Sequence, residues 1–268
     1  MTASPPAAMS PIEKPPRLPP QFELVALDRT GSVVDAALER AADGAGEGTL
    51  VWAREQTGAR TRRGNAWSGY AGNLHCALII EPDYPNEESW QLVYVNVLAA
   101  GSAMAEMVSP MTGLRFAWPN RLLVNDLLAA RVDIAATDST RNPYPALVLG
   151  TSVNVAVHPP QPEPEEYNSI HASGAREITV VDVLEAYASH FLAWSSRWAD
   201  EGFEPLRRAW RIRADGLGSH AEIRLIDRSI EGRVDDVDEH GALALDTDRG
   251  RRCITIGEYF SLDPAPAK

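Results

Sequence analysis

The spacing of apolar residues changes near Gly216 and Gly218, and this change is the strongest constraint on how the chain can fold. Upstream, apolar residues recur at helical spacing over long stretches, the first of which begins at Asn86. Downstream, short segments rich in β-forming residues alternate with turns. A chain of 268 residues can hold one substantial domain and a small second one. We therefore expect a larger domain over residues 21–216 and a small one over residues 219–262.

The larger domain should contain both strands and helices. Its expected strands are residues 22–27, 50–54, 74–80, 115–118, 122–124, 127–135 and 146–157. Helices should follow Ser32 and Thr179, each of which has an aspartate three residues on, and should also cover residues 86–108 and 204–213. In the small domain, the segments 221–226, 230–236, 242–245 and 253–256 predict a small barrel of the SH3-like kind.

The N-terminal 20 residues contain seven prolines and no apolar run, which is typical of a disordered tail and not of a signal peptide. No stretch of the sequence is long and apolar enough to cross a bilayer. An apolar fraction of 44% and a charged fraction of 23% are ordinary for a soluble globular protein. We expect the protein to be cytoplasmic.

Charge and metal-ligating residues exclude several kinds of function. A net charge of -12 argues against general binding to nucleic acid or to anionic membranes. The six histidines form no pair with metal-binding spacing, so we expect no metal site. Cys76 and Cys253 are far apart in sequence and also lack such spacing, which predicts packed thiols.

Three arginines, Arg60, Arg62 and Arg63, stand among small residues in a stretch that leads through Gly64 to Trp67. Guanidinium groups gather phosphate or carboxylate oxygens by paired hydrogen bonds, so this stretch can bind an anion. Like charges in one loop repel each other, and we therefore expect the loop to order over a bound anion. If only the arginines are considered, a solvated basic loop is the simpler interpretation. The anion-binding loop and the solvated loop both remain open.

The order of motifs resembles that of the biotin/lipoate protein ligase family, specifically the biotin protein ligases. The matching motifs are Gln56, Arg60-Thr61-Arg62-Arg63-Gly64, Trp67 and Asn73-Leu74, then Ala117-Trp118-Pro119-Asn120-Arg121, Gly150-Thr151-Ser152-Val153-Asn154 and Asp238-Glu239-His240-Gly241-Ala242-Leu243. In the family these are the biotin-binding loop with its following strand, the Lys-Trp-Pro-Asn-Asp motif, the Gly-x-Gly-x-Asn strand and part of the C-terminal barrel. The resemblance covers residues 22–262 in the family's order, which makes it specific.

The resemblance implies an α+β fold, with a mixed β-sheet flanked by helices as in class II synthetases and an SH3-like barrel after it. It also implies a reaction in which biotin, lipoate or another small acid is joined to the α-phosphate of ATP, with Mg, and then passed to a lysine of a biotinyl- or lipoyl-type carrier domain. Oligomers are compatible with it. The implied ligand-binding residues are Thr30, Gln56, Arg60, Arg62, Arg63, Gly64, Trp67, Asn73, Trp118, Asn120, Leu128 and Asn154.

This chain departs from the family's pattern at positions that carry charge. The family's lysine on the strand after Trp-Pro-Asn aligns with Leu128, and the motif's own lysine and acid align with Ala117 and Arg121. In the triplet that touches the acid substrate, only Thr30 is kept. Joining two anions requires fixed cations, so the departures fall on the catalytic electrostatics. These substitutions favour a protein that keeps the ligand pocket but has an altered or lost ligase activity.

Three arginines are candidates for the missing cation. Arg121 stands in the Trp-Pro-Asn motif itself, and Arg63 belongs to the arginine loop. Arg131 comes three residues after Leu128. Because side chains alternate along a strand, Arg131 should face away from the side of Leu128 unless a bulge intervenes. We therefore predict that Arg121 or Arg63 is the catalytic cation.

Two functions remain open from the sequence. The first is an enzyme, an ATP-dependent ligase or acyltransferase that forms an acyl-adenylate with arginines in place of the lysine. The second is a catalytically inactive binding or assembly protein that holds a small acid or a carrier domain. Leu128 discriminates between them, because an apolar residue there removes a contact to the transition state. An acyltransferase that depends on Cys76 is weaker, since burial in an apolar strand makes a thiol inert.

Overall fold

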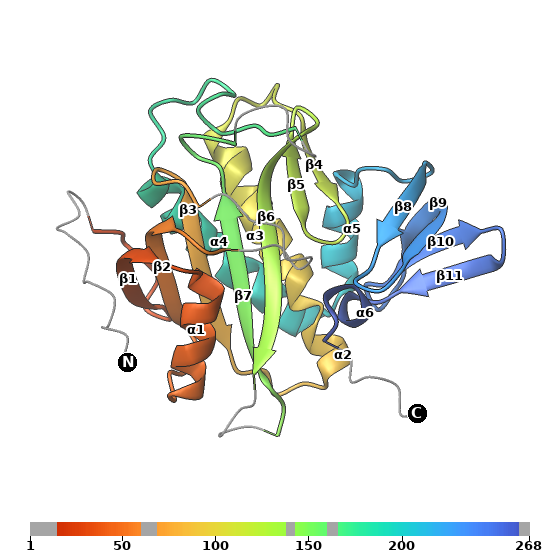
Figure 1. Ribbon diagram of the computed structural model, residues 1–268, viewed down its shortest axis with the longest axis horizontal. Helices are drawn as coiled ribbons and strands as arrows, with labels where there is room; N and C mark the ends of the chain where they lie inside the picture. Colours follow the sequence, from red (N-terminus) through yellow and green to blue (C-terminus); the bar gives the residue numbers. More distant parts are fainter. Residues whose placement is uncertain (1–14, 60–68, 138–142, 160–165, 263–268) are drawn as a thin grey trace.

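The computed structural model describes residues 15–59, 69–137, 143–159 and 166–262 (Figure 1). Within these residues, a seven-stranded sheet carries helices on both faces, and a four-stranded sheet follows near the C-terminus. The larger sheet has the strand order β1-β2-β3-β7-β6-β5-β4. This architecture confirms the expected α+β class with a sheet flanked by helices.

The larger sheet is mixed, because β1 and β2 pair parallel while its other neighbouring strands pair antiparallel. Its strands are β1 (Glu23–Thr30), β2 (Thr49–Gln56), β3 (Leu74–Ile80), β4 (Leu114–Ala117), β5 (Arg121–Val124), β6 (Leu127–Thr137) and β7 (Ala146–Val153). Each of them overlaps a predicted strand. Asn125 and Asp126, both with positive φ, form the tight turn between β5 and β6.

Helix α1 (Val33–Ala42) connects the parallel strands β1 and β2 and covers one face of the sheet. Parallel neighbours need such a crossover, because a tight turn cannot join them. The buried side chains of Val33 and Ala37 pack on β2, β3 and β7. Ser32 caps the helix as predicted, since its side chain accepts a hydrogen bond from the Asp35 N–H at 3.2 Å.

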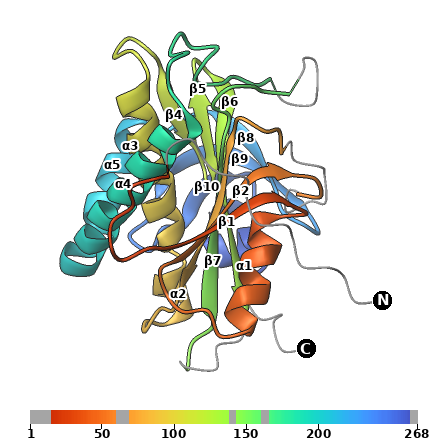
Figure 2. The same ribbon diagram turned by 90° about the vertical axis from the view of Figure 1, so that its left-hand side faces the viewer.

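The opposite face is covered by α3 (Leu92–Met107) and α4 (Val180–Glu201), which Figure 2 shows on the other side of the sheet from α1. Helix α3 contacts both the sheet and α4 and is therefore buried nearly all round. Helix α4 begins with the predicted capping box, formed by Thr179 and Asp182.

The prediction of one helix over residues 86–108 is wrong. The segment divides into α2 (Asn86–Ser89) and α3, and the N–H groups of Val93 and Tyr94 at the break bond to carbonyls three residues back instead of four. The apolar spacing continues across the break, so the sequence pattern did not reveal it.

Gly101 brings α3 into close contact with β4. A Cβ atom there would lie 2.5 Å from two ring atoms of Phe116, which is itself buried. We expect Gly101→Ala to lower the free energy of unfolding by about 1–2 kcal/mol, because overpacking outweighs the gain in helix propensity. Urea denaturation measures this. Gly113→Ala is the matched control, since its Cβ would lie 3.6 Å from the nearest atom, and an equal loss in both variants would contradict the prediction.

The C-terminal unit is an antiparallel sheet with the order β11-β10-β9-β8, followed by α6 (Ile256–Phe260). Its strands are β8 (His220–Arg224), β9 (Ser229–Val237), β10 (Leu243–Thr247) and β11 (Gly250–Ile254). The four strands do not close into a full barrel among the described residues. Their size and antiparallel pairing fit the predicted SH3-like unit.

Hydrogen bonds fix the C-terminal unit to the helices of the larger domain. The Tyr94 hydroxyl of α3 donates to the Gly241 carbonyl at 2.7 Å. Arg207 of α5 (Glu204–Ile212) donates to the Val237 carbonyl at 2.6 Å. The C-terminal unit is therefore held in one position beside the larger sheet.

The N-terminal segment 15–20 lies along α4. The Arg17 backbone N–H donates to the Glu185 carboxylate at 2.7 Å, and Leu18 packs against the core. This part of the predicted disordered tail is thus ordered against α4, and residues 1–14 lie outside the described residues.

Cys76 and Cys253 are free thiols, as predicted. Burial raises the pKa of the Cys76 thiol above its ordinary value, which makes it a poor nucleophile. In the part of the chain that the structure describes, no helix has the length and apolar character needed to cross a membrane.

Candidate functional site

A cavity of about 500 Å³ opens between the first turn of α1 and the face of β6 and β7, and we call it the α1 cavity. Its walls include residues 32–35, Gln56, Arg131, Ser152 and, from the C-terminal unit, Ile226 and Phe260. The cavity therefore combines the N-terminal end of a helix with polar side chains from three strands and an apolar contribution from the second domain.

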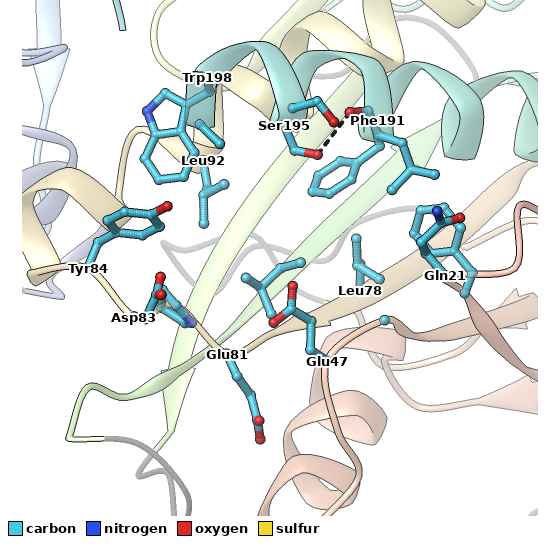
Figure 3. A pocket seen from close by; sticks show the side chains of 17 residues that line it. Gln21, Glu47, Leu78, Glu81, Asp83, Tyr84, Leu92, Phe191, Ser195 and Trp198 are labelled. Carbon is cyan, nitrogen blue, oxygen red and sulfur yellow. Dashed lines mark hydrogen bonds between the residues drawn. The ribbon is translucent and has the colours of Figure 1, made fainter. Parts of the chain in front are cut away.

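A second cavity of about 610 Å³ lies at the opposite end of the sheet, between α4 and the starts of β1 and β2 (Figure 3). Three carboxylates, Glu47, Glu81 and Asp83, stand opposite Phe191 and Trp198 of α4. None of the described residues that line it is basic, and partial burial raises the pKa of Glu47. Such a cavity repels an acid, so the α1 cavity is the candidate site for an acidic ligand.

Gln56 connects the end of β2 to the start of α1. It is buried, and its Oε1 atom accepts a hydrogen bond from the Val33 N–H at 2.8 Å. This bond satisfies one of the N–H groups that a helix leaves unpaired at its N-terminus. Thr30 pairs with Gln56 across β1 and β2, and its hydroxyl donates to the Ser32 carbonyl at 3.4 Å. The structure thus places Gln56, one of the predicted site residues, in the wall of the α1 cavity, with Thr30 beside it.

Four strands present a row of polar side chains beside and beneath the α1 cavity. Arg121 of β5 pairs with Arg131 of β6, Arg131 with Ser152 of β7, and Ser152 with His75 of β3. Directly paired residues on neighbouring strands point to the same face. The row lies on the face that α1 covers, because Gly150, two residues before Ser152, contacts α1 through Val34.

Arg131 does not face away from the side of Leu128, because β6 contains the bulge that the sequence analysis named as the exception. The pairing of β5 with β6 shifts between Leu122, which pairs with Ala130, and Leu123, which pairs with Leu128. One extra residue in β6 breaks the alternation of side chains, so the two positions return to the same face. Leu128 and Arg131 therefore both point to the side of the α1 cavity, as does Arg121.

Leu128 is only 2% exposed and packs in an apolar cluster with Ala117, Leu123 and Tyr167. The segment that contains Tyr167 pairs with β6 at this point, since the Leu128 N–H donates to the Glu166 carbonyl at 2.9 Å. Leu128 is not among the described residues that line the cavity. The position that the resemblance gives to a catalytic lysine is thus apolar and covered.

His75 contacts Ser152 from the neighbouring strand β3. Its Nδ1 atom lies 3.4 Å from the Ser152 hydroxyl oxygen, and its Nε2 atom lies 3.2 Å from the Tyr70 carbonyl oxygen. Burial lowers the pKa of His75 to about 4, so the imidazole is neutral at pH 7. We infer that His75 positions Ser152 and contributes no charge to the site.

His75 should make stability depend on pH. Its folded pKa of about 4 is below its ordinary value of 6.5, so the unfolded chain takes up the proton first as the pH falls. We expect the free energy of unfolding to fall by about 2 kcal/mol between pH 7 and pH 5 through this residue. Urea denaturation at both pH values should show that this loss is absent in His75→Gln. The control is His240→Gln at an exposed position, and the same pH slope in all three proteins would contradict the prediction.

The two predicted asparagines Asn73 and Asn154 are buried, and their amides are hydrogen bonded within the protein. Asn73 Oδ1 accepts from the Val155 N–H at 3.0 Å, and its Nδ2 donates to Asn154 Oδ1 at 3.3 Å. Asn154 Nδ2 donates to the Asn168 carbonyl at 3.1 Å. These bonds hold the segments after β7 against the start of β3, and a direct contact with ligand stays a prediction.

Trp118 and Asn120 also have structural contacts. The Trp118 indole N–H donates to the Tyr94 hydroxyl at 2.9 Å, and its ring lies edge-on to Tyr259 of α6. Asn120 Nδ2 donates to the Val132 carbonyl at 2.8 Å, which fixes the start of β5 against β6. Both side chains therefore support the strand that carries Arg121. Whether they touch ligand stays a prediction.

The predicted arginine loop lies outside the described residues. This applies to Arg60, Arg62, Arg63, Gly64 and Trp67. The expected ordering of this loop over an anion stays a prediction as well. The described residues contain no group of three or more histidine, cysteine, aspartate or glutamate side chains that could hold a metal ion.

Several cavity residues were missed by the sequence analysis. Arg131 was not chosen as the catalytic cation, because regular alternation along the strand would point it away from the side of Leu128. Ser152 occupies the second glycine position of the Gly-x-Gly-x-Asn motif, and the sequence analysis gave it no role. Asp133 follows Arg131 on the same face and also lines the cavity. Ile226 and Phe260 come from the C-terminal unit, and no local pattern indicated that they would reach the larger domain.

Comparison with known families matches most of the chain. Residues 64–212 match the model described as the biotin/lipoate A/B protein ligase family, and residues 216–260 match the biotin protein ligase C terminal domain. The boundary between the two matches coincides with the segment between α5 and β8.

Curated relatives extend over nearly the whole chain. A biotin--[acetyl-CoA-carboxylase] ligase from Paracoccus denitrificans is 30% identical over 238 residues, which are 87% of this chain and 98% of that protein. The bifunctional ligase/repressor BirA from Bacillus subtilis is 27% identical and covers 90% of this chain and 73% of its own length.

Solved structures share the fold. A biotin protein ligase-like protein of unknown function from a Silicibacter species has a TM-score of 0.73 at 23% identity, covering 90% of this chain and 97% of its own. A biotin protein ligase from Aquifex aeolicus, solved with biotin and ATP, has a TM-score of 0.73 at 20% identity and covers 88% and 96%. At these identities, the structural likeness establishes the fold alone.

Proposed function

Because the chain belongs to the biotin/lipoate A/B protein ligase family, we propose that it binds a small carboxylic acid, or the corresponding acyl-adenylate, in the α1 cavity. The acid is biotin, lipoate or another small acid. In this proposal the protein joins the acid to the α-phosphate of ATP and passes the acyl group to a lysine of a carrier domain. Two similar proteins support it, since one is a biotin ligase and another, a biotin protein ligase, was solved with biotin and ATP.

The observation that carries the proposal is the pair of guanidinium groups beside the α1 cavity. Arg121 and Arg131 pair across β5 and β6 on the cavity face, although position 128 is apolar. Joining a carboxylate to a phosphate brings two anions together, and fixed cations stabilise the charge that develops. Guanidinium groups bind both kinds of anion by paired hydrogen bonds. Arg121 is the proposed catalytic cation, in the role that the resemblance assigns to lysine.

ATP supplies the adenylyl group in the proposed reaction. The positive charges of Arg121 and Arg131 complement the negative charge of its phosphates, because a guanidinium group hydrogen bonds to phosphate oxygens in pairs. Magnesium commonly binds through substrate phosphates and water with few protein ligands. An ion that arrives with the nucleotide is therefore compatible with the absence of a metal-ligating cluster among the described residues.

Release of pyrophosphate tests the proposal. The purified protein is incubated with ATP, Mg²⁺ and, in turn, biotin, lipoate or octanoate, and pyrophosphate is measured with a coupled phosphatase. We expect release that depends on the acid, and a rise in melting temperature with the matching acyl-adenylate. If no acid supports release or raises the melting temperature, both the reaction and the assignment of the α1 cavity are contradicted.

A second function is favoured by the covered position of Leu128. The Leu128 side chain packs with Tyr167 in an apolar cluster. It therefore supplies no positive charge at the position where the family resemblance implies a lysine that activates the acid. A protein of this kind would hold a small acid or a carrier domain without activating it. Binding of an acid or adenylate without any release of pyrophosphate would establish this function and contradict the first.

The proposed function also includes an acyl acceptor, a cellular compartment and an oligomeric state. The acyl acceptor is a biotinyl- or lipoyl-type carrier domain, and no contact with nucleic acid or membrane is part of the proposal. Two free cysteines suit a reducing compartment, so we place the protein in the cytoplasm. Size-exclusion chromatography with light scattering distinguishes a monomer from an oligomer.

A further inference from the structure

One hydroxyl group joins the C-terminal unit to the hairpin that carries Arg121. The Trp118 indole N–H donates to the Tyr94 hydroxyl oxygen at 2.9 Å, and the same hydroxyl donates to the Gly241 carbonyl at 2.7 Å. Tyr94 belongs to α3, Trp118 directly follows β4, and Gly241 lies in the turn between β9 and β10. Three separate elements, one of them from the C-terminal unit, therefore meet at a single oxygen atom.

The chemistry of the two partners requires a hydroxyl between them. An indole N–H can only donate a hydrogen bond and a carbonyl oxygen can only accept one, so the group that joins them must do both. Tyr94 is fully buried, and burial raises the pKa of its hydroxyl well above the ordinary value, so this group stays protonated. Loss of the hydroxyl alone would deprive both the Trp118 donor and the Gly241 acceptor of this partner.

The Tyr94 ring has a rigid support. Its centroid lies 4.9 Å from that of Phe203 and 6.0 Å from that of Trp210, and both neighbours meet it edge-on. A Cβ atom on Gly241 would lie 3.0 Å from Tyr94 Cε2, so the turn of the C-terminal unit lies directly against the ring. A phenylalanine at position 94 can therefore keep this packing and lose only the hydroxyl.

Trp118 in turn fixes the hairpin that places Arg121. It precedes Arg121 by three positions, and Ala117 on its other side pairs with Arg121 across β4 and β5. The Trp118 ring is also met edge-on by Tyr259 of α6, at 5.1 Å between centroids. The C-terminal unit thus holds Trp118 twice, directly through Tyr259 and, by way of Tyr94, from the turn at Gly241. A displacement of Trp118 moves the start of β5 with it.

We propose that Tyr94 is a positioning residue, whose hydroxyl ties the C-terminal unit to Trp118 and so fixes Arg121 for the activation of the acid. This inference rests on the proposed function for the role of Arg121. Tyr94 is not among the described residues that line the α1 cavity, so it acts on the rate through Trp118. Small displacements of a catalytic group lower a rate steeply, while the cavity walls that bind the acid stay in place.

Tyr94→Phe in the full chain tests the proposal. At saturating ATP and acid, we expect kcat for the release of pyrophosphate to fall about tenfold, while the dissociation constant of the acid, measured by titration calorimetry, changes less than about twofold. The NMR signal of the Trp118 indole N–H, assigned by its loss in Trp118→Phe, should shift because its hydrogen bond is gone. The matched control is Ser102→Ala, which removes the acceptor of another indole N–H, that of Trp194 at 3.1 Å, and should leave kcat and the Trp118 signal unchanged.

A double variant tests whether Tyr94 acts through Trp118. Trp118→Phe removes the indole donor, so adding Tyr94→Phe to it should lower kcat no further. Losses that multiply in the double variant overturn the proposal, and so does an unchanged kcat in Tyr94→Phe alone. An equal loss of rate and of acid affinity also overturns it, because the hydroxyl would then support the whole fold of the site.

Two further outcomes are decided by separate measurements. Should Tyr94→Phe fail to fold, Gly241→Ala replaces it, since the added methyl group meets the Tyr94 ring, and an unchanged kcat in that variant overturns the proposal. A wild-type protein that releases no pyrophosphate contradicts the proposed reaction. The positioning of Arg121 is then decided by the NMR signal of its Nε–H, assigned by its loss in Arg121→Met. This signal should shift in Tyr94→Phe and not in Ser102→Ala, and the absence of a shift overturns the inference.

Discussion

Leu128→Lys is expected to lower the free energy of unfolding by roughly 3–5 kcal/mol, because it places an ammonium group where apolar side chains now pack. Leu128 is 2% exposed, and its neighbours Ala117, Leu123 and Tyr167 offer no carboxylate. Arg121 stands two residues from Leu123 on the same strand face and adds a like charge. The new lysine therefore gains neither solvent nor a partner.

The pH dependence identifies the cause of this loss. Burial lowers the pKa of a lysine below its unfolded value of about 10.4, so the folded state releases its proton first as the pH rises. The deficit against wild type should shrink as the pH rises from 7 toward 10. Urea denaturation at both pH values measures this. Leu128→Met is the matched control, since a swap of similar volume should cost less than about 1.5 kcal/mol.

The same variant also discriminates between the two candidate functions. If arginines supply the catalytic charge, Leu128→Lys should not raise the release of pyrophosphate, because its ammonium group is covered by Tyr167. A tenfold or larger rise in a folded variant would show that the apolar residue is what limits activation. That result would favour the binding protein over the ligase.

Much of the fold could be predicted because local signals agreed with the final packing. Helices α1 and α4 each follow a capping residue, Ser32 or Thr179, and each carries an apolar face that the sheet buries. The turn at Asn125 and Asp126 lies between two apolar segments and has the residue types that positive φ favours. Local propensity and tertiary contacts point to the same structure at these positions.

Other features depend on contacts that no local pattern contains. The extra residue of β6 lies near Ala129 in a run of leucines and alanines, and neither glycine nor proline marks it. This extra residue changes the direction of the Arg131 side chain, which therefore lines the α1 cavity. The break before α3 is likewise hidden, because the apolar spacing continues through Trp90. Side-chain direction after a bulge follows from the pairing of strands, which sequence spacing alone does not fix.

The candidate site was predictable only in part. The order of motifs led to Gln56 and Arg121, which the structure places at or beside the α1 cavity. The motif asparagines Asn73 and Asn154 are instead hydrogen bonded within the fold. A motif conveys which residues recur together, and it does not separate those that bind ligand from those that hold the binding strands in place.

Arg121→Met is expected to lower the release of pyrophosphate by roughly 10²–10³-fold, the usual cost of removing one donor that acts on the transition state. Arg121 lies at the start of β5, half-buried and directly opposite Arg131. Its methionine replacement keeps the stem that packs on the sheet, so the melting temperature should stay close to that of wild type. The dissociation constant of the acid should change much less than the rate, because Arg131 lies inside the cavity and Arg121 stands beside it.

The split between rate and affinity separates Arg121 from a structural residue. Arg115→Met on the neighbouring strand removes an exposed guanidinium that pairs with Asp126 and Asp215, and it should leave the rate unchanged. If Arg121→Met and Arg115→Met lower the rate equally, the effect is one of general surface charge and Arg121 is not catalytic. If Arg121→Met instead weakens acid binding and leaves the rate at saturation intact, both arginines serve binding. The catalytic charge would then belong to another group, and Arg63 of the arginine loop is the remaining candidate that the sequence offers.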